Sequence, residues 1–500
     1  MAYQMKIPQN LTINDIVDIL KKYAKPGELN TIWKAYELAC RAHNGQLRKS
    51  GEPYIMHPLA VAYILASMRI DATIVATSLL HDVPEDTTVT LEEIEAEFGP
   101  DIAGILRGIT KLGKLKYRGA ERYIENLRKM FVAMSEDVRV MIIKFADRVH
   151  NLMTLESLEE KKRYRIAIES LEIFAPIAHR LGMGEFNALL EDLAFPYVYP
   201  KEFIRTKEIR DKIFAEGENY IEQVLKIIRD ELKNAGIQYL EAHGRKKQLY
   251  SFFQKLLKKN WETEKIYDIL ALRIIVNDIA DCYATLGIIH KLWRPVKGRI
   301  KDYIAQPKPN GYSSLHTTVF SLEGKMVEFQ IRTQQMHYES EFGVAAHWHY
   351  DEHGTRLPTK DILWAKELAE VQKEMLHNLT DLEALKIDFF KNRIFAFTPK
   401  GDVIDLPEDA TPVDFAYAVH SDIGNHCSGA RVNDHLVSLD TALKSGDVIE
   451  IIVEKNRKGP SADWLKTVKT HQARTHIKSL TRSKLNTFIK FIMPKGKSNQ

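Results

Sequence analysis

The stretch His81-Asp82-Val83-Pro84-Glu85-Asp86-Thr87 places an adjacent histidine and aspartate one helical turn before two further carboxylates. With an earlier His57 and a later Asp147, this first pair forms a predicted four-ligand metal site. Imidazole and carboxylate ligands are typical of a divalent transition ion such as Mn²⁺, which polarises a water for attack on a phosphoester. If the helix continues, residues four apart share a face, so Glu85 and Asp86 lie beside the metal.

A structural interpretation competes with this one. A histidine-aspartate pair often arises by chance, His57 before Pro58 suits a helix start, and Pro84 interrupts a helix. The neighbouring segments favour the metal site: Arg48-Lys49-Ser50-Gly51, Tyr54-Ile55-Met56-His57-Pro58-Leu59 and Lys144-Phe145-Ala146-Asp147-Arg148-Val149-His150-Asn151. We interpret His43 and His150 as structural, because helical histidines more often serve packing.

Length and composition bound the class of protein. A chain of 500 residues suggests three or four domains, and 45% hydrophobic with 28% charged residues is ordinary for a globular protein. No apolar run approaches the length of a bilayer span, and the N-terminus has no apolar signal region, so we expect a cytoplasmic location. Cys40, Cys282 and Cys427 lack metal-type spacing and are interpreted as reduced thiols.

The end of the chain is strongly basic. From Lys455 to Gln500 there are twelve lysines or arginines against one acid, Asp463. This charge attracts a polyanion such as RNA, but a solubilising or disordered end explains it equally well.

Hydrophobic spacing predicts helices over most of the first 200 residues. They cover Trp33–His43, Pro58–Met68, Ile74–His81 and Glu136–Leu155. Thr90-Leu91-Glu92-Glu93 has the form of a capping box and predicts a helix that stops at Gly99-Pro100. Phe203–Asn234 is predicted as a long charged helix that bridges two domains.

The pattern then changes to that of an α+β domain with a mixed sheet. Strands are predicted at Leu270–Val276, Leu315–Leu322 and Met326–Ile331, with helices at Gln248–Asn260 and Asp281–Trp293. After a predicted helical linker, a small module has strands at Ile394–Thr398, Val403–Leu406, Ala430–Val432 and Val448–Val453 and a helix at Val413–Val419.

A second group of polar residues lies in this α+β region. Cations and glycines occur in Gly244-Arg245-Lys246-Lys247, Gly298-Arg299-Ile300-Lys301 and Pro307-Lys308-Pro309-Asn310-Gly311-Tyr312. Asp268 and Glu328 are the nearby acids, and Glu328 shares a strand face with Gln330. The set suits phosphoryl-type transfer on a nucleotide without a Walker A motif. On spacing alone, a basic nucleic-acid surface explains these residues equally well.

Taken together, these segments resemble the long RelA/SpoT-type bifunctional (p)ppGpp synthetase/hydrolase family. The resemblance covers about residues 25 to 485 and rests on RKSGEPYIMHPL, HDVPEDT, KFADRVHNLMTL, APIAHRLGMGEF, GRKKQLYSFFQK, YDILALRIIV, PKPNGYSSLHTTV, EFQIRTQQMH and GVAAHWHY. It implies three folds: an all-α HD-type hydrolase domain, an α+β nucleotidyltransferase-like synthetase domain and a small β-grasp TGS domain. The zinc-finger and ACT domains of long members are not expected here.

The resemblance implies roles for the first group of residues. The hydrolase removes the 3′-pyrophosphate of (p)ppGpp with Mn²⁺, and the residues that match its metal ligands are His57, His81, Asp82 and Asp147. Glu85 and Asp86 match its catalytic acids. The matches to its nucleotide contacts are Arg48, Lys49, Ser50, Asn151 and Thr154. Pro84 departs from the family's usual aliphatic residue and either fits a bend or displaces Glu85.

The second group resembles the synthetase, which moves pyrophosphate from ATP to the 3′-hydroxyl of GDP or GTP. Asp268 matches its Mg²⁺ ligand, and Glu328 matches the carboxylate beside that hydroxyl. The matches to its nucleotide-binding residues are Arg245, Lys247, Ser251, Lys301, Lys308, Tyr312, His316 and Gln330. Arg299-Ile300-Lys301-Asp302 resembles the loop of bifunctional members.

The remaining segments complete the expected organisation. The TGS domain implies contact with uncharged tRNA on the ribosome, with His420 at that contact. The predicted boundaries are 1–200 for the hydrolase domain, 201–235 for a helical bridge, 236–350 for the synthetase domain, 351–389 for a helical linker, 390–454 for the TGS domain and 455–500 for a basic helical tail.

We therefore expect a stringent-response enzyme with two opposed sites, coupled through the helices of residues 180 to 235 so that one closes as the other opens. Two alternatives stay open: a hydrolase whose inactive synthetase domain is regulatory, and an RNA-bound or ribosome-bound sensor.

Overall fold

The computed structural model divides into two compact units, Met1–Lys373 and Glu374–Gln500. It describes residues 6–113, 130, 132–134, 136–245, 247–263, 271–308, 310–346, 393–400, 403–444, 446–454, 456–457, 459–470 and 472–481. The predicted linker at 351–389, the metal ligand Asp268 and the last part of the predicted basic tail lie outside these residues.

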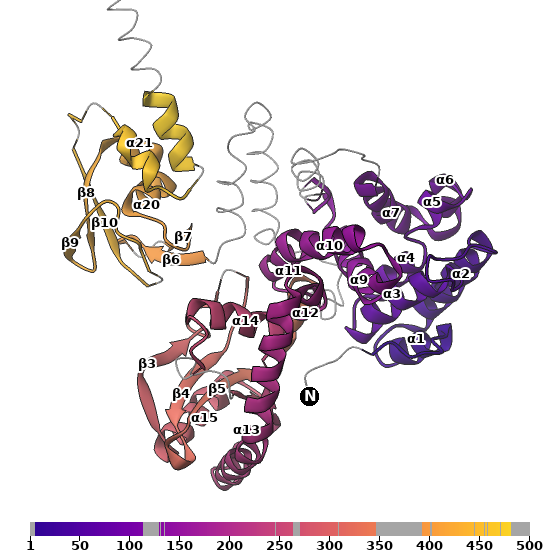
Figure 1. The fold of residues 1–500 in the computed structure, drawn as a ribbon, viewed down its shortest axis with the longest axis horizontal. Coiled ribbons are helices and arrows are strands. Elements are labelled where there is room, and N and C mark those ends of the chain that lie inside the picture. The colour runs from indigo at the N-terminus through magenta and orange to yellow at the C-terminus, as the bar shows by residue number, and fades with distance from the viewer. Residues whose placement is uncertain are drawn as a thin grey trace, which may run out of the picture. The chain divides into compact units, whose positions relative to one another are not determined.

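The first unit begins with a helical part (Figure 1). Its helices are α1 (Ile13–Leu20), α2 (Pro26–Ala42), α3 (Met56–Ser67), α4 (Ala72–Leu79), α5 (Val83–Asp86), α6 (Leu91–Phe98), α7 (Pro100–Gly113), α9 (Arg139–Met153), α10 (Glu160–Glu169), α11 (Ala175–Arg180) and α12 (Gly184–Val198). α3 is apolar on every side and is buried against α4 and α9, which makes these three helices the centre of this part. The helices predicted here are confirmed, with shifted ends.

The helix predicted through the histidine-aspartate pair was wrong in one respect. α4 ends at Leu79, the pair lies in a turn, and the short helix α5 starts at Val83. Pro84 occupies the first turn of α5, where a missing N–H costs nothing because that N–H has no helical partner. The amides of Glu85 and Asp86 both donate to the carbonyl of Asp82, so the bend itself keeps the later acids beside the pair. Pro84 is therefore accommodated.

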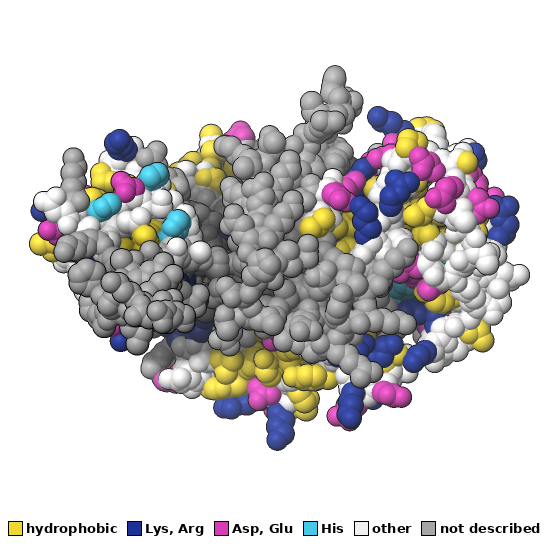
Figure 2. Space-filling model, turned by 90° about the horizontal axis from the view of Figure 1, so that it is seen from above, with side chains coloured by type: hydrophobic (Ala, Val, Ile, Leu, Met, Phe, Trp, Pro, Cys, Tyr) yellow, Lys and Arg dark blue, Asp and Glu magenta, His cyan; other side chains and the backbone are white. Residues whose placement is uncertain are grey.

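Two other sequence signals are confirmed. Thr90 accepts from the amide of Glu93 while the Glu93 carboxylate accepts from Thr90, which closes the capping box of α6. The long helix appears as α13 (Pro200–Asn234). Figure 2 shows acidic and basic side chains interspersed on the surface of the helical part, where Arg107 pairs with Glu95. Such exposed pairs each add little to stability.

After α13, the chain forms a mixed sheet in the order β1-β2-β5-β4-β3. Its strands are β1 (Tyr239–Arg245), β2 (Ala271–Val276), β3 (Arg294–Asp302), β4 (Leu315–Phe320) and β5 (Met326–Thr333). The central pair β2 and β5 is parallel and the other pairs are antiparallel. α13 and α15 (Ile279–Leu292) share one apolar core with the sheet, in which Val224 and Ile289 are fully buried with Phe329. β2, β4 and β5 confirm predicted strands, whereas β1 and β3 were not predicted.

Glycines allow the end of α11 and the start of α12 to pack closely against the part of the unit that contains the mixed sheet. The helix α16 (Gln334–Phe342) follows β5 and ends at Gly343, whose φ is +56°. A side chain at Gly343 would overlap the carbonyl oxygen of Leu181, while the next amide, that of Val344, donates to this oxygen at 3.0 Å. Nearby, the Asn310 side-chain amide donates to the carbonyl of His179 at 3.1 Å. Backbone therefore lies against backbone at this joint.

A second contact joins α12 to the same part of the unit. The Asp192 carboxylate accepts from the amides of Leu249 at 3.2 Å and Tyr250 at 2.9 Å. These are the first amides of α14 (Leu249–Lys258), which have no partner within their own helix. Asp192 thus caps α14 from another helix, and its position fixes where α14 begins.

The second unit is a small module with two sheets. β6 (Arg393–Phe397) pairs with β7 (Val403–Pro407), and β10 (Ile449–Val453), β8 (Cys427–Val432) and β9 (His435–Val437) form the other sheet. The helices are α20 (Pro412–Val419) and α21 (Ser421–His426). The predicted strands and helix are confirmed; β9 and α21 are additional. Fully buried Asp414 accepts from the amides of Thr411, in its own capping box, and of Thr470. None of the helices within the described ranges is long and apolar enough to cross a bilayer.

We predict that Gly343→Ala destabilises the first unit much more than Gly324→Ala. Both glycines have a positive φ, of +56° and +72°, so alanine at either position adds the same type of backbone strain. Only at Gly343 does the new side chain meet backbone, since Gly324 has open space. The added loss should be about 2 kcal/mol or more in the free energy of unfolding. Thermal denaturation measures this extra loss of stability. Equal melting temperatures for the two variants would contradict the close backbone contact at Gly343.

A pH dependence follows from Glu185 on α12. Burial raises the pKa of Glu185 to about 7, and Glu341 adds to the rise against the pull of Arg273. The folded pKa of Glu185 lies above the unfolded value of 4.5. The contribution of the protonated side chain to the free energy of unfolding is therefore complete below pH 4.5 and is lost as pH rises through 7.

Glu185→Gln should therefore gain stability relative to the parent between pH 5 and 8, by up to about 3 kcal/mol. Urea unfolding at both pH values measures this gain, with the exposed Glu208→Gln as a charge-matched control. A difference between Glu185→Gln and the parent that does not change with pH would rule out the raised pKa.

Candidate metal and nucleotide sites

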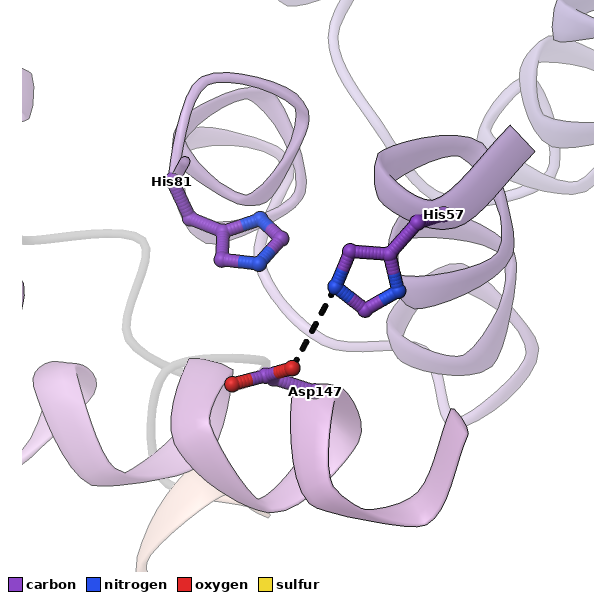
Figure 3. Close-up of side chains that lie close together, drawn as sticks. All are labelled: His57, His81 and Asp147. Carbon is purple, nitrogen blue, oxygen red and sulfur yellow. Dashed lines mark ion pairs between the residues drawn. The ribbon is translucent and has the colours of Figure 1, made fainter. Parts of the chain in front are cut away.

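Three helical segments bring the predicted metal ligands together. His57 lies on α3, Asp147 lies on α9, and His81 lies in the turn after α4; Figure 3 shows the three side chains pointing toward one another. One ligand atom from each lies within 4.8 Å of the others. His57 Nε2 is 3.3 Å from an oxygen of Asp147 and 3.5 Å from one of Asp82, which also lies 3.2 Å from His81 Nε2.

The hydrogen bonds of His81 test whether a cation fits. Its Nδ1 lies 2.7 Å from the carbonyl oxygen of Ser78 and must donate to it, because a carbonyl only accepts. Nε2 therefore carries a lone pair, is buried, and has no hydrogen-bond partner. A lone pair aimed at the Asp82 carboxylate is repulsive unless a cation lies between them. Two imidazoles and two carboxylates are a donor set for a divalent transition ion, so the residues fit a metal.

Electrostatics favour ionised carboxylates at Asp82 and Asp147 and a neutral ring at His57. Burial acts to raise the pKa of Asp147, but the charge of Lys144 holds it well below its usual range. Burial lowers the pKa of His57 even though Asp147 acts to raise it. Metal ligands need these protonation states, so the site is preset for a cation.

The two acids of α5 lie at the edge of this cluster. The Tyr54 hydroxyl is 2.7 Å from an oxygen of Asp86 and 2.9 Å from one of Asp82, so it connects a predicted catalytic acid with a predicted metal ligand. Desolvation raises the pKa of Glu85, against the pull of Lys144 and together with the neighbouring carboxylates. A carboxyl group with a raised pKa holds a proton more readily than an ordinary one, which suits acid–base chemistry. Tyr54 had no predicted role.

The residues predicted to contact the nucleotide lie beside the metal cluster. Arg48 donates to the side chain of Asn151 at 3.0 Å, and the Thr154 hydroxyl donates to the carbonyl of His150 at the end of α9. Lys49 and Ser50 are exposed in the loop before α3. His150, which we interpreted as structural, instead has its Nδ1 2.7 Å from Nδ1 of His57.

The second group converges on Glu328 in β5. His316 Nδ1 lies 2.9 Å from Glu328 Oε1, to which the Gln330 side-chain amide also donates at 3.0 Å. Arg245 donates to Gln330 at 3.1 Å, and Tyr312 Oη lies 2.8 Å from His316 Nε2. Burial acts to raise the pKa of Glu328, but His316, Gln330 and nearby cations lower it to about 2. Glu328 is therefore ionised at neutral pH.

Lysines crowd the same carboxylate. Burial, together with Lys247, lowers the pKa of Lys255 to about 6, and burial lowers that of Lys247 to about 8 although Glu328 acts to raise it. Lys308 Nζ lies 4.8 Å from the ring centre of Tyr303. Lys301 is opposite His316 in the register of β3 and β4. A polyanion bound beside these amines would favour their protonated forms, so the cluster suits a phosphate-rich ligand.

The sequence missed Lys255, which lies inside the GRKKQLYSFFQK segment without an assigned role. Its position four residues after Ser251 in α14 was the available signal, since residues four apart share a helix face. In the second unit, His420 is exposed, and its Nδ1 accepts from the amide of Asp422 at the start of α21.

Known protein families match three regions of the chain. They are an HD domain over residues 35–184, the region found in RelA / SpoT proteins over residues 244–355, and a TGS domain over residues 394–453. A GTP pyrophosphokinase of Myxococcus xanthus is 44% identical over 470 residues, which are 93% of this chain and 62% of that protein.

Two further relatives match over a similar range. A guanosine-3′,5′-bis(diphosphate) 3′-pyrophosphohydrolase of Aquifex aeolicus is 45% identical over 94% of this chain and 66% of its own length. The bifunctional (p)ppGpp synthase/hydrolase SpoT of Escherichia coli is 44% identical over 93% of this chain and 66% of its own length. The chain thus spans 62 to 66% of the length of these curated relatives.

We predict that Mn²⁺ added to metal-free protein raises the melting temperature of the first unit, because an ion that binds the folded state stabilises it. Asp147→Asn should remove most of this rise and weaken Mn²⁺ binding at least about tenfold, since it removes one charged ligand. Glu92→Gln, at an exposed position of α6, changes the net charge equally and should keep the full effect. If Asp147→Asn gained as much as Glu92→Gln, the ion would be binding elsewhere.

Proposed function

Because the chain belongs to the RelA/SpoT family, we propose that it is a bifunctional alarmone enzyme, which makes (p)ppGpp from ATP and GDP or GTP and also hydrolyses its 3′-pyrophosphate. Relatives of similar identity are named for one activity, for the other, or for both. The observation that carries the proposal is that one chain holds both a His57, His81 and Asp147 cluster and a hydrogen-bonded network around Glu328.

For hydrolysis, we propose that His57, His81, Asp82 and Asp147 hold Mn²⁺. The bound ion would supply a water of lowered pKa and a positive charge for the phosphates. Glu85 and Asp86 would handle the protons of the attacking water and the leaving oxygen, with Tyr54 orienting Asp86. The guanosine nucleotide would be held by Arg48, Lys49, Ser50, Asn151 and Thr154.

For synthesis, we propose that Glu328 accepts the hydrogen bond of the 3′-hydroxyl of GDP or GTP and directs its oxygen at the β-phosphorus of ATP. The new bond forms there as the bond to AMP breaks, which transfers the pyrophosphate. Tyr312 would stack on guanine. The other groups proposed to bind the nucleotides are Arg245, Lys247, Ser251, Lys301, Lys308, His316 and Gln330, with Mg²⁺ held by Asp268.

We also propose RNA as a partner of the second unit. A TGS match and the exposed imidazole of His420 support a contact with the 3′ end of uncharged tRNA on the ribosome. The twelve cations against one acid from Lys455 onward favour a polyanion in the same way. The described cysteines are free thiols, which fits a cytoplasmic enzyme.

Two substitutions should separate the two activities. Glu328→Gln should lower (p)ppGpp formation from ATP and GDP by about 100-fold or more while hydrolysis is kept, because it removes the charge beside the acceptor hydroxyl. Asp147→Asn should do the reverse. Both rates are read from nucleotide chromatography of purified protein with Mn²⁺ and Mg²⁺.

Glu323→Gln, in the exposed turn before β5, is the matched control and should change neither rate. A parent protein that hydrolyses but never synthesises would favour the alternative, a hydrolase with a regulatory synthetase domain. Absence of both activities, with RNA binding retained, would favour the sensor.

A further inference from the structure

The Arg48 guanidinium reaches two neighbouring side chains of α9 at once. Its Nη1 lies 3.1 Å from His150 Nδ1, and its Nη2 donates to Asn151 Oδ1 at 3.0 Å. A guanidinium has only donors. His150 Nδ1 must therefore accept, which makes the proton of this neutral ring lie on Nε2.

This direction determines the state of the metal ligand His57. His57 Nδ1 lies 2.7 Å from His150 Nδ1, and both rings are buried. Because His150 Nδ1 already accepts from Arg48, it carries no proton to give, so His57 Nδ1–H is the donor. The lone pair of His57 is then on Nε2, the atom that lies 3.3 Å from Asp147 and 3.5 Å from Asp82.

The second contact of Arg48, with Asn151, leads to the metal ligand Asp147. Arg48 occupies Oδ1 of Asn151, which fixes the orientation of the amide. Asn151 Nδ2 then donates to Asp147 Oδ1 at 2.6 Å. One guanidinium thus holds a histidine ligand through His150 and a carboxylate ligand through Asn151.

The other histidine ligand does not depend on this arrangement. His81 Nδ1 donates to the backbone carbonyl of Ser78, within its own segment. Local backbone therefore orients His81, whereas Arg48 reaches both His57 and Asp147 through its two partners. Asp147 also accepts from Lys144 at 3.3 Å, and Asp82 accepts from Tyr54 at 2.9 Å.

We propose that Arg48, acting through His150 and Asn151, is the positioning residue for the metal ligands His57 and Asp147. This inference deepens the proposed hydrolase function and rests on it for the identity of the ion. Binding partners of metal ligands fix the tautomer and orientation of those ligands, and their loss weakens metal binding. Metal and nucleotide binding are then linked, because a nucleotide that draws on Arg48 changes the support of two ligands, and the linkage is reciprocal.

The test measures Mn²⁺ binding to the metal-free full chain without nucleotide, by the electron paramagnetic resonance signal of free Mn²⁺. Arg48→Lys loses the two-pronged geometry, and His150→Leu loses the acceptor. Each should raise the Kd for Mn²⁺ by about 10- to 100-fold. In His150→Asn, the amide oxygen can take the place of Nδ1 as acceptor, so this variant should recover most of the affinity lost in His150→Leu.

Arg41→Lys is the control, because Arg41 is exposed in the last turn of α2 and has no role at either site, while the substitution is the same as at Arg48. Its Kd for Mn²⁺ should match the parent. The melting temperature of each metal-free variant checks folding. If His150→Leu does not fold, the Kd of Arg48→Lys for Mn²⁺ tests the inference by itself, because Arg48 is only partly buried.

Unchanged Mn²⁺ affinity in folded Arg48→Lys, or equal affinities in His150→Leu and His150→Asn, would overturn the inference. Failure of the proposed function looks different: a parent protein that binds Mn²⁺ but leaves ppGpp intact. If the variants keep the parent's affinity and the parent hydrolyses ppGpp, only the positioning role is lost.

Discussion

Two histidines that have already committed their Nδ1 protons control the chemistry of the helical part. His57 and His81 each turn a lone pair toward half-buried carboxylates, and neither histidine has a proton left to share with them. In a buried setting, such an arrangement costs free energy unless a cation occupies the centre. α3, α9 and the turn after α4 supply these ligands from one packed helical core, so the helical core and the metal preference depend on each other.

A backbone joint ties the mixed-sheet part of the first unit to α11 and α12. The glycine at 343 brings the end of α16 against the carbonyl of Leu181, and Asn310 reaches the carbonyl of His179 from the loop that carries Tyr312. On the other side, Asp192 caps α14, which follows Lys247. Residues on both sides of the Glu328 network are thus tied to α11 and α12, so a shift of these helices moves more than one group of that network. This arrangement gives a physical route for the coupling that we expected between the sites.

The sequence predicted what depends on local spacing. The buried helices and the central strands β2 and β5 follow apolar periodicity and were found where expected. The Thr90 capping box follows a local polar pattern and was also found where expected. β1 and β3 were missed because they are edge strands rich in charged residues, without an apolar alternation. The helix through His81 was wrong because a turn precedes Pro84, and periodicity does not reveal where a helix yields to a turn.

The site was predictable in part for the same reason. His57, His81 and Asp147 stand in segments with distinctive neighbours, and the structure places them together. The contacts of His150 with His57, 93 residues apart, and of Tyr54 with Asp82 and Asp86 depend on how helices pack, so no spacing rule finds them. The roles of the site residues, and the place of Asp268, stay predictions.

The buried carboxylate of Asp414 has a consequence for the order in which the second unit is made. Its Thr411 partners are available as soon as α20 has been synthesised, but the amide and hydroxyl of Thr470 come 56 residues later. Until then, the Asp414 carboxylate lacks three of its five donors, because the amide of Lys469 also comes late, and it is better solvated outside the module. The module can collapse around its strands early, yet it closes over Asp414 only after the following segment has left the ribosome. Folding of this unit during translation is therefore timed by chain that lies beyond its last strand.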